Sequence, residues 1–183
     1  MSDETVSARI SKKVCFIINR IDFGRDLEKQ LKMYTEARGM FGNLDEVTET
    51  LIGSTLRLAM KAHKFRRAKH DKKTLGFVKA CVAYCHITIP SLHSDKHQTR
   101  LFLNTSRVAL CNGLISETDS IIKATLLCLN ATFKKTESFN EDEVLTGHLS
   151  NIIGHLIVVP SDPDKHFFQT AMQVQNLIKK KQW

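Results

Sequence analysis

Apolar residues recur at steps of three and four along almost the whole chain, which places each set on one side of an α-helix. The clearest sets are Val6, Ile10, Val14, Ile17 and Ile21; Phe23, Leu27, Leu31 and Tyr34; Leu44, Val47, Leu51 and Leu58; Leu75, Val78, Val82 and Cys85; Leu145, Leu149, Ile152 and Leu156. A helix with one apolar side must pack that side against another element. The pattern therefore predicts an all-α fold.

The stripes divide into eight helices, which we expect to start near residues 5, 22, 44, 74, 98, 116, 141 and 163. An antiparallel pair then takes roughly 45 residues, close to the 40–47 of HEAT and armadillo repeats. A second stripe on the fourth helix, Phe77, Cys81, Tyr84 and Thr88, is typical of a helix with neighbours on two sides. We predict a single α-solenoid segment of HEAT-like helix pairs over residues 1–183, with a closed helical bundle as the alternative.

Short polar residues mark the predicted starts and ends of these helices. Three of them stand three residues before an acid, as N-caps do: Asn43 before Glu46, Ser116 before Asp119 and Asn140 before Glu143. Asp162 before Pro163 predicts a further start, and Asn112–Gly113 predicts a helix end.

The five cysteines lie in apolar stretches and are odd in number, which favours buried thiols in a reducing compartment. The first residues are polar and lack the apolar core of a secretory signal. No run of about 18 apolar residues is present to span a bilayer. We therefore expect a cytoplasmic protein.

Cys81, Cys85 and His86 resemble a metal-ligand set, since positions 81 and 85 share a helix face. A structural zinc site needs four ligands, usually two from a second element, and no second pair has matching spacing. Cysteine is also one of the most frequently buried residues, so we favour core packing.

His148 and His155 lie seven residues apart on one helix with Asn151 between them. They could orient a metal or a proton-transfer pair, but we favour a polar seam against the next helix because no carboxylate shares that face. His93 and His97 flank Asp95 after Pro90, where a weak ion site and a solvated loop both fit.

Motifs of catalysis and nucleotide binding are missing from the sequence, including phosphate-binding loops, nucleophile elbows and His-Glu-x-x-His. We therefore predict a protein that is not an enzyme and has no cofactor.

Positive charge concentrates between residues 61 and 73, which carry much of the net charge of +8. The basic run consists of Lys61, Lys64, Arg66, Arg67, Lys69, Lys72 and Lys73, with Asp71 as its one acid. A solvated loop is the favoured interpretation, followed by a surface for an acidic partner or anionic membrane, with Arg66, Arg67, Lys69, Lys72 and Lys73 as the candidate contacts. Nucleic acid is the least favoured partner, because Phe65 alone offers a ring for base stacking.

A second charged segment, with Arg20, Asp22 and Arg25, separates the first two predicted helices. We interpret it as a structural salt-bridge turn rather than an interface, since exposed charge pairs are common at helix junctions.

The run VCFIINRIDFGRDLEKQLKMYTEARGMFGNL (14–44) resembles the large subunit of retriever, an endosomal recycling complex. That subunit is a distant relative of the large vacuolar-protein-sorting subunit of retromer. The segments KKTLGFVKACVAYCHITIPSL (72–92) and RVALCNGLISETDSIIKATLLCL (107–129) continue the similarity in the same order. The resemblance is strongest over residues 14–129.

This resemblance implies a long α-solenoid that bridges an arrestin-like subunit and, near its C-terminal end, a small subunit of metallophosphoesterase fold. The assembly associates with coiled-coil and COMM-domain proteins, as the Commander complex, and returns cargo from endosomes to the cell surface. The matching stretch belongs to the C-terminal half, which cradles the small subunit. We thus expect a scaffold, peripheral on endosomes, and keep a basic helical-repeat module that binds anionic membrane or nucleic acid as the alternative.

Overall fold

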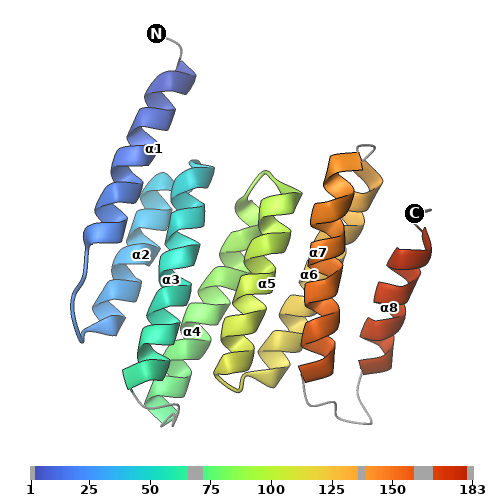
Figure 1. The fold of residues 1–183 in the computed structure, drawn as a ribbon. Helices are drawn as coiled ribbons and strands as arrows, with labels where there is room; N and C mark the ends of the chain where they lie inside the picture. Colours follow the sequence, from blue (N-terminus) through green and yellow to red (C-terminus); the bar gives the residue numbers. More distant parts are fainter. Residues whose placement is uncertain (1–2, 66–71, 136–138, 159–166, 181–183) are drawn as a thin grey trace. The chain divides into compact units, whose positions relative to one another are not determined.

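The computed structural model describes residues 3–65, 72–135, 139–158 and 167–180. In these ranges the chain forms eight α-helices and one 3₁₀ turn, without a β-strand (Figure 1). None of the helices in the described ranges is both long and apolar enough to cross a lipid bilayer. The all-α class predicted from the apolar periodicity is confirmed.

The chain divides into two compact units, Met1–His93 (unit 1) and Ser94–Trp183 (unit 2). The HEAT-like repeat type and the single segment over 1–183 stay predictions.

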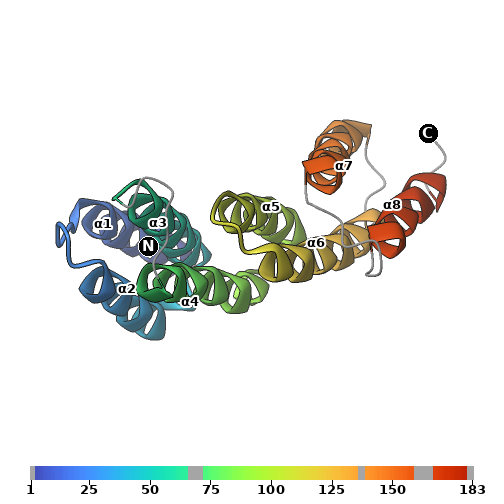
Figure 2. The same cartoon turned by 90° about the horizontal axis from the view of Figure 1, so that it is seen from below.

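Unit 1 is built from four helices and the 3₁₀ turn: α1 Asp3–Arg20, α2 Leu27–Phe41, α3 Asp45–Phe65, α4 Lys72–Thr88 and η1 Ile89–Ser91. Figures 1 and 2 show α1 and α3 in one layer and α2 and α4 in the other. Helix α3 packs against α1, α2 and α4, which explains why it is buried on several sides. The core of unit 1 contains Ile18, Tyr34, Ala37, Val47, Leu51 and Leu58.

Unit 2 repeats this two-layer arrangement with α5 Asp95–Cys111, α6 Ile115–Lys135, α7 Phe139–Val158 and α8 Phe167–Lys180. Helices α5 and α7 form one layer, and α6 and α8 form the other (Figure 2). The unit 2 core contains Leu103, Ile122, Leu126, Leu129, Leu149, Ile152, Val174 and Leu177. Within each unit, the packing of consecutive helices and of alternate helices is that expected of α-solenoid helix pairs.

The turn between α1 and α2 moves the start of α2 to residue 27, five residues after the predicted start. Gly24 has a φ of +64°, and its N–H donates to the Asp22 carboxylate over 2.9 Å. Asp26 then caps α2 by accepting from the Lys29 N–H. A left-handed residue cannot continue a right-handed helix, so residues 22–26 are a turn.

The end of α5 lies where Asn112–Gly113 predicted it. Gly113 has a φ of +72°, and the Leu114 N–H donates back to the Ala109 carbonyl over 3.0 Å. These features define a Schellman-type helix end, in which glycine takes the left-handed position.

The predicted N-caps are displaced by one or two residues. Ser116 and Asn140 lie inside helices that begin at Ile115 and Phe139, and Asn43 stands two residues before Asp45. Asp162 and Pro163 lie outside the described residues.

Helix α1 departs from the stripe predicted for it. It buries Ser11 and Ile18, whereas Val6, Ile10 and Ile17 are 40–54% exposed. The reason is that α1 packs chiefly on α3, along one side only.

Candidate partner-docking surfaces

The basic run lies at the end of α3 and the start of α4. Lys61, Lys64, Lys72 and Lys73 are described, whereas Arg66, Arg67 and Lys69 lie outside the described residues. Of the four described lysines, Lys64, Lys72 and Lys73 are exposed and Lys61 is half-buried. The candidate contacts named from the sequence therefore stay a prediction.

Lys61 and Lys73 form ion pairs, one with an acid of the turn before α2 and one with an acid in the first turn of α2. The Lys61 Nζ lies 2.9 Å from the Asp22 carboxylate, and the Lys73 Nζ lies 3.3 Å from that of Glu28. The hydrogen bond from Lys61, followed by that from the Gly24 N–H, lowers the pKa of Asp22. Part of the charge of the run is thus balanced within unit 1.

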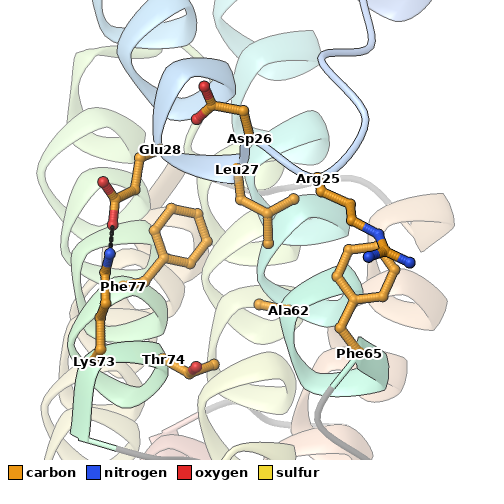
Figure 3. Close-up of a pocket in the computed structure, with 9 residues that line it drawn as sticks. All are labelled: Arg25, Asp26, Leu27, Glu28, Ala62, Phe65, Lys73, Thr74 and Phe77. Atoms are coloured by element: carbon orange, nitrogen blue, oxygen red, sulfur yellow. Dashed lines mark ion pairs between the residues drawn. The ribbon is translucent and has the colours of Figure 1, made fainter.

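A groove of about 810 Å³ opens beside this run and is bounded by α2, α3 and α4. Figure 3 shows Leu27, Ala62 and Phe77 around its interior, with Arg25 and Phe65 on one side and the Glu28–Lys73 pair on the other. Its charged lining residues are two cations and two acids, since Asp26 also lines it. Among the described lining residues, positive charge is therefore not in excess for an acidic partner.

Helix α7 presents a second surface of different character. Residues 146–158 contain no Asp, Glu, Lys or Arg. One face of this stretch is exposed and consists of small and apolar residues: Thr146, Gly147, Ser150, Ile153, Gly154 and Ile157. Ile157 is 78% exposed and the neighbouring Val158 is 66% exposed. An uncharged exposed face with large apolar side chains is typical of a protein interface.

The cysteines of α4 lie in the core of unit 1, as the core-packing interpretation predicted. Cys81 and Cys85 are fully buried, and burial raises the pKa of Cys81 to about 12. The Cys85 thiol faces the Ile52 carbonyl at 3.9 Å. In the described part of the chain, no group of three or more His, Cys, Asp and Glu side chains is placed to hold a metal ion.

His155 of α7 belongs to a polar seam, as expected, but the seam faces α5 rather than the next helix along the chain. His155 is buried, with Nδ1 2.9 Å from the Asn151 carbonyl and Nε2 3.2 Å from the Ser106 hydroxyl. Asn151 in turn accepts a hydrogen bond from Arg107 of α5. Both ring nitrogens of His155 are therefore occupied by groups of the fold.

His148 is the member of this pair with an unsatisfied atom. Its Nε2 is buried and has no hydrogen-bond partner among the residues that the structure describes. Burial, with the nearby charges of Lys96 and Arg100, lowers the pKa of His148. The neutral form of the His148 ring is thus favoured at neutral pH.

His93 does pair with an acid, but with Asp45 rather than with Asp95. Its Nδ1 lies 2.9 Å from one carboxylate oxygen of Asp45, and its backbone N–H donates to the other over 3.0 Å. This double contact ties the end of η1 to the start of α3 within unit 1.

The charged turn between α1 and α2 has the structural role that we expected, but its acid Asp22 pairs with a lysine of α3. Asp22 bonds Gly24 and Lys61 rather than Arg20 or Arg25. The Arg20 guanidinium lies 4.7 Å from the centre of the Phe16 ring, and Arg25 lines the groove.

Gln30 is a buried polar residue that the sequence analysis missed. Its side chain donates to the Ile21 carbonyl and the Tyr34 hydroxyl, and accepts from the Phe23 N–H, all within 2.9 Å. The signal for it was its position on the stripe, at steps of three and four from Leu27 and Tyr34.

A comparison with protein families decides what kind of chain this is. The profile of the family described as the VPS35L C-terminal domain matches residues 1–183. The chain belongs to this family. The resemblance to the C-terminal part of a VPS35-like large subunit, strongest over 14–129, is confirmed and extends along the whole chain.

Relatives within the VPS35L family are known from distant organisms. The chain is 37% identical over 175 residues to the human "VPS35 endosomal protein-sorting factor-like" and 36% identical over 180 residues to the "VPS35 endosomal protein sorting factor-like" of Dictyostelium discoideum. A Drosophila melanogaster relative is 34% identical over 174 residues. These matches cover 91%, 96% and 91% of the chain, but it spans only 18% of each relative's length.

Proposed function

We propose that this VPS35L C-terminal domain is a non-enzymatic scaffold segment in endosomal protein sorting. It holds the small metallophosphoesterase-fold subunit of a retriever-type complex, which joins coiled-coil and COMM-domain proteins in the Commander assembly. Partners keep it on the cytoplasmic side of endosomes, where the complex returns cargo to the plasma membrane. The observation that carries this proposal is the family match along all 183 residues.

The environments of Cys81 and His155 support a scaffold rather than an enzyme. The Cys81 thiol, with its pKa raised to about 12, stays protonated at neutral pH. A protonated, buried thiol is a poor nucleophile. The two ring nitrogens of His155 contact the Asn151 carbonyl of its own helix and the buried Ser106 hydroxyl of α5, so both are held by groups of the fold.

The exposed face of α7 is the surface that we assign to the small subunit. Interface cores are depleted of charge and enriched in apolar contact area, and this face has both properties. Gly147 and Gly154 have open space where a side chain would project, so a partner's backbone can approach the helix closely. Ile153, Ile157 and Val158 supply the apolar area.

Co-expression of the chain with the small subunit tests this proposal. Ile157→Asp places a charge in a contact that the partner would desolvate, and we expect it to reduce recovery of the small subunit at least tenfold. The matched control is Met40→Asp on α2, an exposed apolar residue of unit 1 at 68% exposure. Equal recovery of the small subunit with both variants would remove α7 from the interface, and no recovery with the unmodified chain would refute the scaffold role.

The net charge of +8 and the basic run favour one alternative, a module that binds anionic membrane or nucleic acid. The pairs Lys61–Asp22 and Lys73–Glu28 weaken it by balancing two of the four described lysines. Charge reversal at Arg66, Arg67, Lys69 and Lys73 separates the two functions. The alternative requires this variant to lose binding to phosphatidylserine vesicles or RNA, whereas the scaffold proposal requires it to keep the small subunit.

A further inference from the structure

A second groove, of about 390 Å³, runs between α6 and α8 in unit 2. Its apolar lining consists of Leu126, Leu127 and Leu177. Leu126 and Leu177 belong to the core, but Leu127 is 72% exposed although it borders a concave surface. Leucine in such a position offers contact area to a bound apolar side chain.

The remaining lining residues are three amides and one lysine: Asn130 of α6, Gln173 and Asn176 of α8, and Lys123. Lys123 is already paired with Asp119 over 2.8 Å, so the described lining of the groove has no unbalanced charge. Each amide supplies a carbonyl acceptor and an N–H donor. Among the described residues, none of the three amides hydrogen-bonds to another group of the chain.

We propose that the groove between α6 and α8 binds a short, uncharged, extended peptide segment of a partner protein. Two apolar side chains of the segment contact the leucines, and its backbone is held by the three amides. A peptide backbone presents the alternating donors and acceptors that Asn and Gln side chains match. A lipid chain or other purely apolar ligand would bury these amides unpaired, which is costly.

The described lining of the groove indicates the length of the segment. Lys123 and Asn130 are seven residues apart on α6, which is about 10 Å along a helix. An extended chain advances about 3.3 Å per residue, so about three residues lie in the groove. Alternate residues of an extended chain point to the same side, so the first and third contact the leucines. The described lining of the groove contains no residue of the α7 face, which we assign to the small subunit.

NMR titration of the 183-residue chain with the capped pentapeptide Gly-Leu-Ser-Leu-Gly tests the proposal. We expect saturable shifts of the side-chain amide signals of Asn130, Gln173 and Asn176 and of the Leu127 methyls. A pentapeptide N-methylated at its serine keeps every side chain but loses one backbone donor, and it should bind about tenfold more weakly.

Protein variants provide the matched control. The double change Gln173→Leu and Asn176→Leu keeps side-chain bulk but removes hydrogen bonding, and should weaken binding at least tenfold. Gln175→Leu changes an exposed residue of the same helix outside the groove and should leave binding unchanged. Unshifted signals of Ile152 and Val174 establish that the core of each variant is intact. Equal binding of the N-methylated peptide, shifts outside the groove, or no shifts at millimolar peptide would overturn the proposal.

Discussion

At the scale of single residues, Gln30 shows how one buried side chain fixes the path of the chain. It is 4% exposed and bonds the Ile21 carbonyl, the Phe23 N–H and the Tyr34 hydroxyl. Gln30→Leu fits the space but leaves these groups unpaired, so we expect the free energy of unfolding to fall by about 2–3 kcal/mol. Urea denaturation followed by circular dichroism measures it. Gln175→Leu, on the surface, should change it by less than about 0.5 kcal/mol, and an equally small change for Gln30→Leu would contradict this role.

His148 gives unit 2 a stability that depends on pH. Because its pKa is lowered in the folded state, the unfolded chain takes up a proton at higher pH than the folded chain does. The stabilisation is fully present above the ordinary histidine pKa of about 6.5 and is lost as the pH falls toward the lowered folded value. We expect the melting temperature to fall between pH 7.5 and pH 5.5, and His148→Gln to reduce that fall. If the melting temperatures of His148→Gln and of the unmodified chain depended on pH in the same way, His148 would be excluded as the cause of the pH dependence.

At the scale of helices, glycines in different backbone conformations should respond oppositely to alanine. Gly113 ends α5 in the left-handed region, so Gly113→Ala should cost about 1 kcal/mol. Gly39 lies inside α2 with open space around its Cα, so Gly39→Ala should stabilise by about 0.5–1 kcal/mol. Chemical denaturation of both variants measures the change in the free energy of unfolding. Two changes of the same sign would contradict the assignment of Gly113 to the end of α5.

The helices themselves could be predicted from the sequence because their apolar stripes have to be buried. The stripe through Leu149 and Ile152 forms part of the unit 2 core, as expected. The start of α2 was misplaced because the turn depends on Gln30 and on the positive φ of Gly24. The exposed Ile153 and Ile157 could not be recognised, since a second apolar side also fits a helix with neighbours on two sides.

At the scale of the whole molecule, the surfaces were harder to predict than the fold. The basic run was recognisable from its composition, but the ion pair between Lys61 and Asp22 joins residues 39 positions apart. In the α6–α8 groove, Asn130 lies more than 40 positions along the chain from Gln173 and Asn176, and nothing in their local sequence relates them. Charge and stripes are local properties of a sequence, whereas a groove depends on how distant helices pack.

The proposed scaffold role is tested most directly by the stoichiometry of a complex. The purified chain is mixed with the small metallophosphoesterase-fold subunit and analysed by size-exclusion chromatography with light scattering. Our account predicts a one-to-one complex that the Ile157→Asp variant fails to form and the Met40→Asp variant forms normally. Separate elution of the unmodified chain and the small subunit, at micromolar concentrations of both, would contradict it.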